Sequence, residues 1–199
     1  MKRDEDIIEQ INTLWVPIYP FMADHVLKVS GVGSGYVLDL GPFAGGLAVN
    51  LLIKSSGFRA KVMDESERVL RWAAQQAREK GCSSRLTVCR TSIEPIPEPD
   101  GSFDLVLVRG AFFFLTSPLL REIKRVLRFG GWAWVGGGYG PLTPDSVIDP
   151  IGERSKKWNQ ELGKQRITVE EAERFLITVG VASSARLSTE GGLWIEIKG

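Results

Sequence analysis

Two groups of residues have the types and the separation needed to hold a nucleotide-like ligand. Gly41, Gly45 and Gly46 follow the short apolar run YVLDL, and Asp64 ends the later run KVMD. Glycines at the end of a strand let the backbone turn sharply and approach a ligand at the start of a helix. A carboxylate roughly twenty residues further on can accept hydrogen bonds from a ribose diol. Because many nucleotide-binding folds share this separation, the spacing by itself predicts only an adenosine-type ligand.

A second glycine cluster competes for this assignment. Gly31, Gly33 and Gly35 precede the run YVLDL, whereas ligands of open α/β sheets bind at the carboxyl ends of the strands. We therefore interpret the first cluster as a helix-to-strand connection and the second as the ligand loop. The second cluster reads G-P-F-A-G-G, which does not fit the dinucleotide pattern G-x-G-x-x-G. A nicotinamide-dependent oxidoreductase is accordingly the least favoured enzyme class.

The elements that must position these residues alternate along the chain. An N-terminal helical stretch, residues 4–29, is broken near Pro17 and Pro20. Strands are expected at residues 36–40, 59–63, 86–90, 103–108 and 132–135, and at 181–187 and 193–197. Helices are expected at residues 47–54, 67–80, 117–128 and 169–179, and a less regular region at 136–165. This alternation predicts an α/β fold: a doubly wound, mostly parallel seven-stranded sheet, with helices on both faces and a C-terminal antiparallel hairpin.

Length and composition limit the possible classes of protein. We expect a single domain over residues 1–199, with a helical cap at 1–30 and a lid insertion at 140–166. The formal net charge of +1 gives no global reason to expect nucleic acid or a membrane as a partner. Two cysteines and one histidine make a disulfide framework or a metal cluster unexpected. The acidic N-terminus lacks the apolar core of a signal peptide, so we expect a cytoplasmic protein.

The central part of the chain resembles a known enzyme family. The stretch SFDLVLVRGAFFFLTSPLLREIKRVLRFGGWAWV is similar to the middle of class I S-adenosylmethionine-dependent methyltransferases. The segments VLDLGPFAGG and KVMDESERVLRWAAQQA precede it in the order and spacing of that family, so the resemblance covers about residues 35–136. It implies a Rossmann-like methyltransferase domain with S-adenosylmethionine as cofactor, and methyl transfer by in-line displacement.

The resemblance also implies a set of cofactor-binding positions. In this sequence they are Asp39, Gly41, Phe43, Gly45, Asp64, Glu65, Ser92, Ile93 and Arg109. The loop with Asp39, Gly41 and Gly45 would surround the methionine part of the cofactor, although Asp39 is also compatible with a purely structural tie of the loop backbone. Asp64 would hold the ribose hydroxyls. Glu65 would lie beside the ribose.

The remaining implied positions lie after the third and fourth strands. Ser92 and Ile93 fall where the family contacts the adenine ring, and Arg109 falls near the sulfonium and the acceptor. Three positions depart from the family pattern: Phe43 replaces the middle glycine of D-x-G-x-G-x-G, Ser92 replaces the usual acidic residue, and Phe129 replaces the proline of a turn. The first two departures keep open a degenerate member that binds the cofactor weakly or does not turn over.

A small-molecule acceptor is the first expectation, because a domain of this size leaves little room for separate recognition of a macromolecule. Tyr19, Phe112 and Trp158 are the candidate acceptor contacts, and Arg109 indicates an anionic group on the acceptor. Tyr19 is equally compatible with packing of the N-terminal helix. His25 is a possible general base, but a packed histidine is the favoured interpretation. No catalytic residue is assigned, since positioning two reactants suffices for this chemistry.

One further alternative remains open at this point. The basic segment 154–166 is compatible with a methyltransferase that acts on RNA or on an acidic protein, although a solvated helix is the simpler interpretation. Neither the acceptor atom nor the oligomeric state follows from the sequence.

Overall fold

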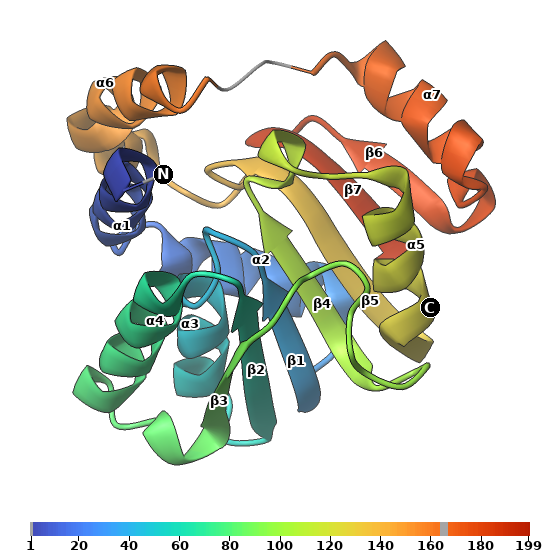
Figure 1. The fold of residues 1–199 in the computed structure, drawn as a ribbon, viewed down its shortest axis with the longest axis horizontal. Helices are drawn as coiled ribbons and strands as arrows, with labels where there is room; N and C mark the ends of the chain where they lie inside the picture. The colour runs from blue at the N-terminus through green and yellow to red at the C-terminus, as the bar shows by residue number, and fades with distance from the viewer. Residues whose placement is uncertain (1, 164–166) are drawn as a thin grey trace.

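The structure is a computed structural model, and it describes residues 2–163 and 167–199. A seven-stranded sheet with the order β3-β2-β1-β4-β5-β7-β6 forms its centre (Figure 1). The strands are β1 (Gly35–Leu40), β2 (Phe58–Asp64), β3 (Leu86–Arg90), β4 (Phe103–Arg109), β5 (Leu127–Gly138), β6 (Ala185–Ser188) and β7 (Gly192–Lys198). The α-helices are α1 (Lys2–Leu14), α2 (Tyr19–Ser30), α3 (Gly46–Lys54), α4 (Glu67–Glu79), α5 (Ser117–Val126), α6 (Asp145–Glu161) and α7 (Val169–Val179).

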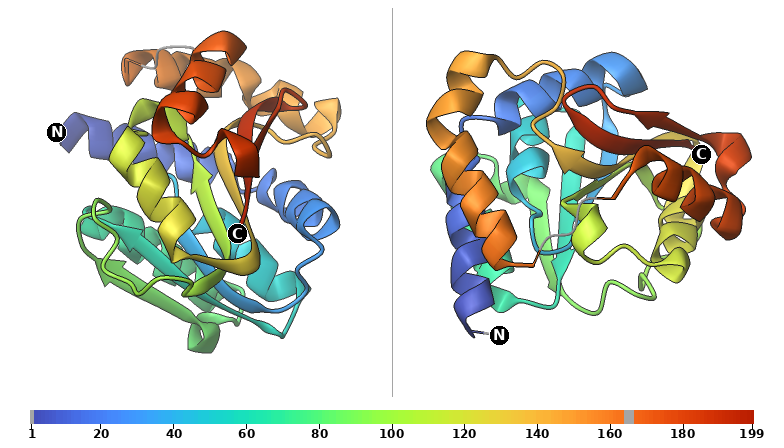
Figure 2. Two further views of the ribbon diagram at one scale, coloured as in Figure 1. Left: turned by 90° about the vertical axis from the view of Figure 1, so that its right-hand side faces the viewer. Right: turned by 90° about the horizontal axis from the view of Figure 1, so that it is seen from above.

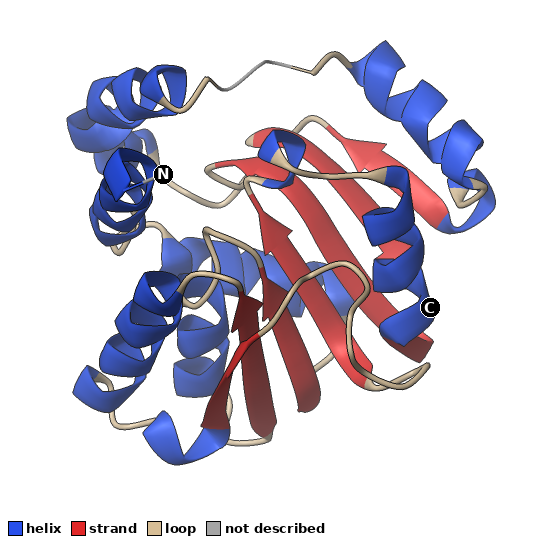
Figure 3. Cartoon of the chain, viewed as in Figure 1, coloured by secondary structure: helices blue, strands red, loops and turns tan. Residues whose placement is uncertain are grey.

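Strand pairing confirms the predicted fold class. Strands β1 to β5 are parallel to one another, and β7 lies antiparallel between β5 and β6 (Figure 3). The runs VLDL in β1 and DLVLVR in β4 are almost continuously apolar because both of their faces are covered. From β1 the chain adds β2 and β3 on one side of the sheet, and then crosses to the other side, where it adds β4 and β5. The carboxyl ends of β1 and β4 are therefore the topological switch point of the sheet.

Helices cover both faces of the sheet, as expected. Helices α2, α3 and α4 pack with one face into the larger hydrophobic cluster, and α5 and α7 pack with the other face into the second cluster (Figure 2). Helix α7 starts with a capping box in which Thr168 and Glu171 satisfy each other's backbone N–H groups. Thr168 is therefore the N-cap of this helix.

Several predicted boundaries are wrong. The strand predicted over residues 181–187 begins only at Ala185, because Ala182–Ser184 form a 3-10 turn. The helix predicted over residues 117–128 ends at Val126, and the strand predicted over 132–135 runs from Leu127 to Gly138. Pairing of Leu127 with Phe103 of β4 extends the strand at this end, with a register shift before Leu105. The less regular region predicted after β5 contains helix α6, seventeen residues long. Local propensity hides this helix, since Pro150 and Gly152 lie inside it.

Helices α1 and α6 lie side by side, beyond the edge where the parallel strands end (Figure 2). A buried hydrogen bond joins them: Trp15 Nε1, just after α1, donates to Ser155 Oγ of α6 over 3.0 Å. Arg68 of α4 binds Asp6 and Glu9 of α1. These contacts place the two helices next to the carboxyl ends of the strands. Among the described residues, no helix has the length and apolar character needed to span a membrane.

Candidate functional site

The glycine loop after β1 is organised by the buried carboxylate of Asp39. Its Oδ2 accepts hydrogen bonds from Gly45 N (2.9 Å) and Ala48 N (3.0 Å), which fixes the loop at the start of α3. Gly41 N donates to Met63 O (2.9 Å), so the loop lies against the end of β2. Burial raises the pKa of Asp39 to about 6, against the two backbone hydrogen bonds and the charge of Arg109. The structural tie considered for Asp39 is therefore present, and its second oxygen, Oδ1, has no partner among the described residues.

Asp64 stands at the end of β2, where the sequence analysis places it. Its Oδ1 accepts a hydrogen bond from Ser66 N (2.7 Å), at the start of α4. Burial raises the pKa of Asp64 to about 6, and the charges of Glu65 and Glu5 add to that effect while the Ser66 bond opposes it. A half-satisfied, desolvated carboxylate in this position is suited to accepting hydroxyl hydrogen bonds.

The residues expected around an adenine ring come together beside Asp64. Thr91 N donates to Asp64 O (3.2 Å), which brings the segment after β3 next to the end of β2. Ser92 and Glu65 are exposed and Ile93 is partly buried against the second hydrophobic cluster. The Ser92 hydroxyl is already engaged with its own loop, because it donates to Glu94 O (3.0 Å). Thus the ends of β2 and β3 lie together, with the buried carboxylate of Asp64 at the end of β2 and the exposed residues Glu65 and Ser92 just after the two strands.

Arg109, the last residue of β4, is fully enclosed at 4% exposure. Its Nη2 donates to Asn12 Oδ1 (2.6 Å) and to Tyr19 Oη (2.7 Å), which are both neutral oxygens. Its Cζ lies 4.5 Å from the ring centroid of Trp15 and 5.0 Å from that of Phe43. Burial lowers the pKa of the guanidinium, although arginine stays charged in proteins. The end of β4 therefore carries a cation inside an aromatic enclosure.

Aromatic rings pack directly on Gly41 of the predicted cofactor loop and on Gly110, the residue after β4. A Cβ added to Gly41, whose φ is +94°, would lie 2.6 Å from Cζ of Phe114. A Cβ added to Gly110 would lie 2.4 Å from Cδ2 of Phe43. The carboxylate of Asp64 and the glycine loop fit the ribose and amino acid portions of S-adenosylmethionine, provided that these rings turn away. Phe43, which replaces a glycine of the family pattern, therefore affects how closely the cofactor can approach its binding loop.

A small cavity beside Arg109 and a larger groove along α6 share part of their lining. The inner cavity, about 20 Å³, is lined by Arg109, Phe43 and Phe113 among others. The outer groove, about 800 Å³, runs along α6 and the loop after β5. Both are lined by Trp15, Gly138 and Asn159. The stacked pair Trp15–Tyr139, with centroids 4.8 Å apart, forms part of the groove wall.

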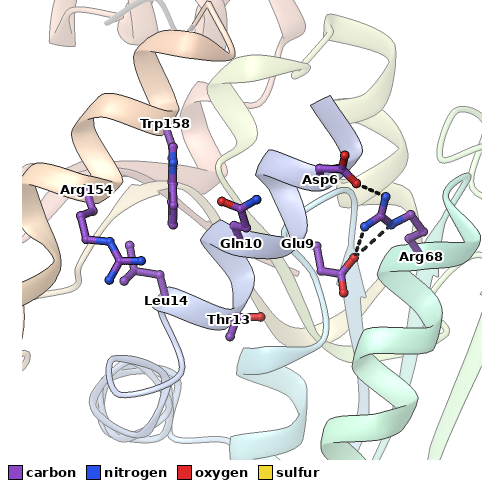
Figure 4. A pocket seen from close by; sticks show the side chains of 8 residues that line it. All are labelled: Asp6, Glu9, Gln10, Thr13, Leu14, Arg68, Arg154 and Trp158. Atoms are coloured by element: carbon purple, nitrogen blue, oxygen red, sulfur yellow. Dashed lines mark hydrogen bonds and ion pairs between the residues drawn. The ribbon is translucent and has the colours of Figure 1, made fainter. Parts of the chain in front are cut away.

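A third space lies on the outer side of α1, and Figure 4 shows its lining. This α1–α6 hollow, about 560 Å³, has Asp6 and Glu9 of α1 facing Arg68 of α4, and Trp158 of α6 on the opposite side. Arg154 Cζ lies 5.2 Å from the ring centroid of Trp158. The predicted acceptor contact Trp158 therefore lines this hollow, and neither described space beside Arg109 includes it.

The structure separates the other predicted acceptor contacts. Tyr19 is buried and binds Arg109, and burial raises the pKa of its hydroxyl to about 12. Phe112 packs into the hydrophobic cluster on the opposite face of the sheet. His25 is buried beside Trp134, with ring centroids 5.0 Å apart, so the packed interpretation holds for it. Residues 164–166, at the end of the predicted lid and basic segment, lie outside the described residues.

Two contributing residues were missed by sequence reasoning. Asn12 binds Arg109 and also donates from Nδ2 to Pro42 O of the glycine loop (3.1 Å). Asn159 lines both the inner cavity and the outer groove. The signal that marks Asn12 in the sequence is a polar residue on the apolar side of a helix, next to Ile8 and Ile11.

Comparison with known proteins agrees with this fold and this arrangement of strand ends. Residues 38–135 match the methyltransferase domain family. Over the whole chain, the structure superposes on a putative S-adenosylmethionine-dependent methyltransferase from Methanococcus maripaludis with a TM-score of 0.80 and 28% identity, covering 99% of this chain and 92% of that one. Topology, glycine loop and strand-end carboxylate together define a class I methyltransferase fold. The chain belongs to the class I S-adenosylmethionine-dependent methyltransferases.

Two curated relatives match part of the chain. A sarcosine/dimethylglycine N-methyltransferase from Halorhodospira halochloris is 35% identical over 126 residues, which cover 61% of this chain and 44% of the relative. A ubiquinone/menaquinone biosynthesis C-methyltransferase from Shewanella oneidensis is 28% identical over 119 residues, covering 57% and 47%. The chain thus spans less than half the length of each of these relatives.

Proposed function

We propose that this protein binds S-adenosylmethionine across the ends of β1, β2 and β3 and transfers its methyl group to a small-molecule acceptor. The single observation that carries the proposal is the pairing of the Asp39-tied glycine loop with the buried carboxylate of Asp64, at the switch point of the sheet. When bound, the cofactor supplies an electrophilic methyl group on a sulfonium.

The chain's own residues would bind and orient the two reactants. Asp64 would accept hydrogen bonds from the ribose hydroxyls. Glu65 would lie beside the ribose, and Ser92 and Ile93 would contact the adenine ring. The loop with Asp39, Gly41, Phe43 and Gly45 would hold the amino acid part, next to Arg109 at the end of β4. Excluding water and aligning the reactants contribute most of the rate in such a transfer, which agrees with the absence of an assigned catalytic residue.

The acceptor would enter from the groove along α6. Residues 1–30 then serve as a cap over the strand ends, and the insertion at 140–166 serves as a lid, of which residues 140–163 are described. The names of the two curated relatives support a small acceptor, and Arg109 supports an anionic group on it. Cys82 and Cys89 are both free thiols, which supports a reducing, cytoplasmic setting.

Turnover tests this function directly. The purified protein should convert S-adenosylmethionine to S-adenosylhomocysteine in the presence of at least one member of a panel of small carboxylates, amines and phenols. Asp64→Ala should lower kcat/KM at least about tenfold, because hydrogen bonds to a charged group are lost. Asp100→Ala is the matched control, since Asp100 is exposed and forms an ion pair with Arg125 at the opposite end of the strands. Equal rates for Asp64→Ala and Asp100→Ala would contradict the proposal.

A second candidate function is favoured by one observation. The ring of Phe114 packs on Gly41 of the cofactor loop, and the ring of Phe43, itself in that loop, packs on Gly110 after β4, as they would in a member that has lost turnover. Such a protein would bind S-adenosylhomocysteine weakly and transfer no methyl group to any acceptor. Phe43→Gly would then raise the affinity for S-adenosylhomocysteine without producing turnover, whereas an active enzyme shows turnover before this substitution.

A further inference from the structure

Arg109 is a buried charge whose neighbours do not neutralise it by direct contact. Both hydrogen bonds that its guanidinium donates go to neutral oxygens, those of Asn12 and Tyr19. Its Nε, although fully buried, has no partner among the described residues. Asp39 attracts it through space, but Asp39 already gives its Oδ2 to the glycine loop. A desolvated charge without an ionic partner is costly, so such groups in proteins usually meet a counter-ion.

The position of Arg109 makes that counter-ion a ligand and not a part of the fold. Asp39 pairs in register with Leu107, and alternate residues of a strand share a face, so Arg109 lies on the same face as Asp39 and one step nearer the strand ends. Arg109 lines the inner cavity, which shares part of its lining with the groove along α6. Aromatic rings enclose the rest of the guanidinium. These rings lower the local dielectric and strengthen an ion pair formed there.

We propose that Arg109 binds a carboxylate group of a ligand in the inner cavity, with Asn12 and Tyr19 as positioning residues that hold the guanidinium in place. This inference rests on the proposed function and names the chemistry of its acceptor. A planar guanidinium with free N–H donors matches the two oxygens of a carboxylate. The cavity has room for about one water molecule, so Phe43 or Phe113 shifts when the carboxylate enters.

Two molecules could supply this carboxylate: the acceptor and the amino acid part of the cofactor. The lining residues of the cavity continue into the α6 groove and do not include Gly41 or Asp64, which favours the acceptor. The contribution from the cofactor can be isolated experimentally. S-adenosylhomocysteine carries the carboxylate, whereas 5′-methylthioadenosine shares its adenosine part and lacks the amino acid.

The experiment uses three variants of the full chain. Arg109→Gln removes the charge, Arg109→Lys keeps the charge but lacks the planar fork, and Arg121→Gln removes an exposed arginine of α5 as the matched control. Thermal unfolding is followed in sodium acetate and in sodium chloride at equal ionic strength, with acetamide as the neutral isostere. Calorimetry then measures the affinities for S-adenosylhomocysteine and for 5′-methylthioadenosine.

We expect acetate, but not chloride or acetamide, to stabilise the wild type and Arg121→Gln. Arg109→Gln should lose this response, and Arg109→Lys should need at least about ten times more acetate for the same effect. Unchanged affinity for S-adenosylhomocysteine in Arg109→Gln would then assign the carboxylate to the acceptor. A tenfold or greater loss for S-adenosylhomocysteine alone, with 5′-methylthioadenosine unaffected, would assign it to the cofactor.

Two results would overturn the proposal or its basis. If Arg109→Gln is only less stable, and responds to acetate and to both nucleosides as the wild type does, Arg109 is merely a clamp between α1, α2 and β4. If Arg109→Gln does not fold, Arg109→Lys is compared with the wild type instead. An acetate response of Arg109→Lys equal to that of the wild type would then also show that Arg109 is only a structural contact. Failure of the wild type to bind S-adenosylhomocysteine contradicts the proposed function instead, because the acetate measurement needs no cofactor.

Discussion

Two buried carboxylates stand at the ends of neighbouring strands, and burial raises the pKa of each to about 6. Asp39 satisfies the start of α3, whereas Asp64 makes one hydrogen bond, to Ser66 N. Asp64 is thus a partly desolvated carboxylate whose hydrogen-bonding capacity is not filled by its contacts within the described residues. Retention of such a group is expected where a ligand completes its hydrogen bonding.

The raised pKa of Asp64 gives a pH dependence of definite sign. The folded protein holds this proton more tightly than the unfolded chain, in which an aspartate titrates near pH 4. Stability from protonated Asp64 is therefore fully present below about pH 4 and is lost as the pH rises through about 6. Asp64→Asn does not lose stability in this way, because its side-chain amide does not titrate. We expect its free energy of unfolding, relative to the wild type, to increase across this range.

Denaturant unfolding at a series of pH values measures this difference. Asp100→Asn controls for the removal of one negative charge at an exposed site. A difference between Asp64→Asn and the wild type that stays constant with pH would show that Asp64 is solvated in the folded protein.

At the residue scale, the sequence predicts Asp64 and the glycine loop because their positions follow from strand ends and local spacing. It does not predict the enclosure of Arg109. The groups that enclose it, Asn12, Trp15 and Tyr19, lie about ninety residues away along the chain and meet it only through the packing of α1 and α2. No local pattern near Arg109 carries that information.

At the scale of elements, helix α6 and the start of β5 are determined by tertiary contacts. Helix α6 contains Pro150 and Gly152, but Ile151 and Ser155 are buried against the rest of the molecule, and Trp15 holds Ser155. Strand β5 begins early because Leu127 pairs with β4. Helices with regular apolar spacing and ordinary caps, such as α4 and α7, were predictable within a residue.

The contact between Trp15 and Ser155 should hold α6 against α1. Ser155→Ala leaves the buried indole N–H of Trp15 without its partner, so we expect a loss of about 1–3 kcal/mol in the free energy of unfolding. Amide hydrogen exchange in α6 should accelerate more than in α3 or β4. Ser84→Ala, at an exposed position beyond the opposite end of the sheet, is the control. Uniform acceleration, or none, would mean that other contacts position α6.

At the scale of the whole molecule, the mostly parallel seven-stranded sheet and its antiparallel C-terminal hairpin were predictable from the alternation of elements and from the family resemblance, but the order of the strands was not predicted. The molecule places its glycine loop, its two carboxylates and Arg109 along one edge of the sheet, with α1 and α6 beside that edge (Figure 1). The extent to which aromatic rings fill this edge was not predictable, because Phe43 and Phe114 meet glycines in segments distant from their own.

The central claim is that this edge binds S-adenosylmethionine, and one calorimetric titration tests it most directly. The wild type is titrated with S-adenosylhomocysteine and, separately, with NAD, alongside Asp64→Asn. The account predicts one S-adenosylhomocysteine per chain, no binding of NAD, and an affinity at least about tenfold weaker in Asp64→Asn. Absence of binding by the folded wild type, or equal affinity in Asp64→Asn, would contradict it.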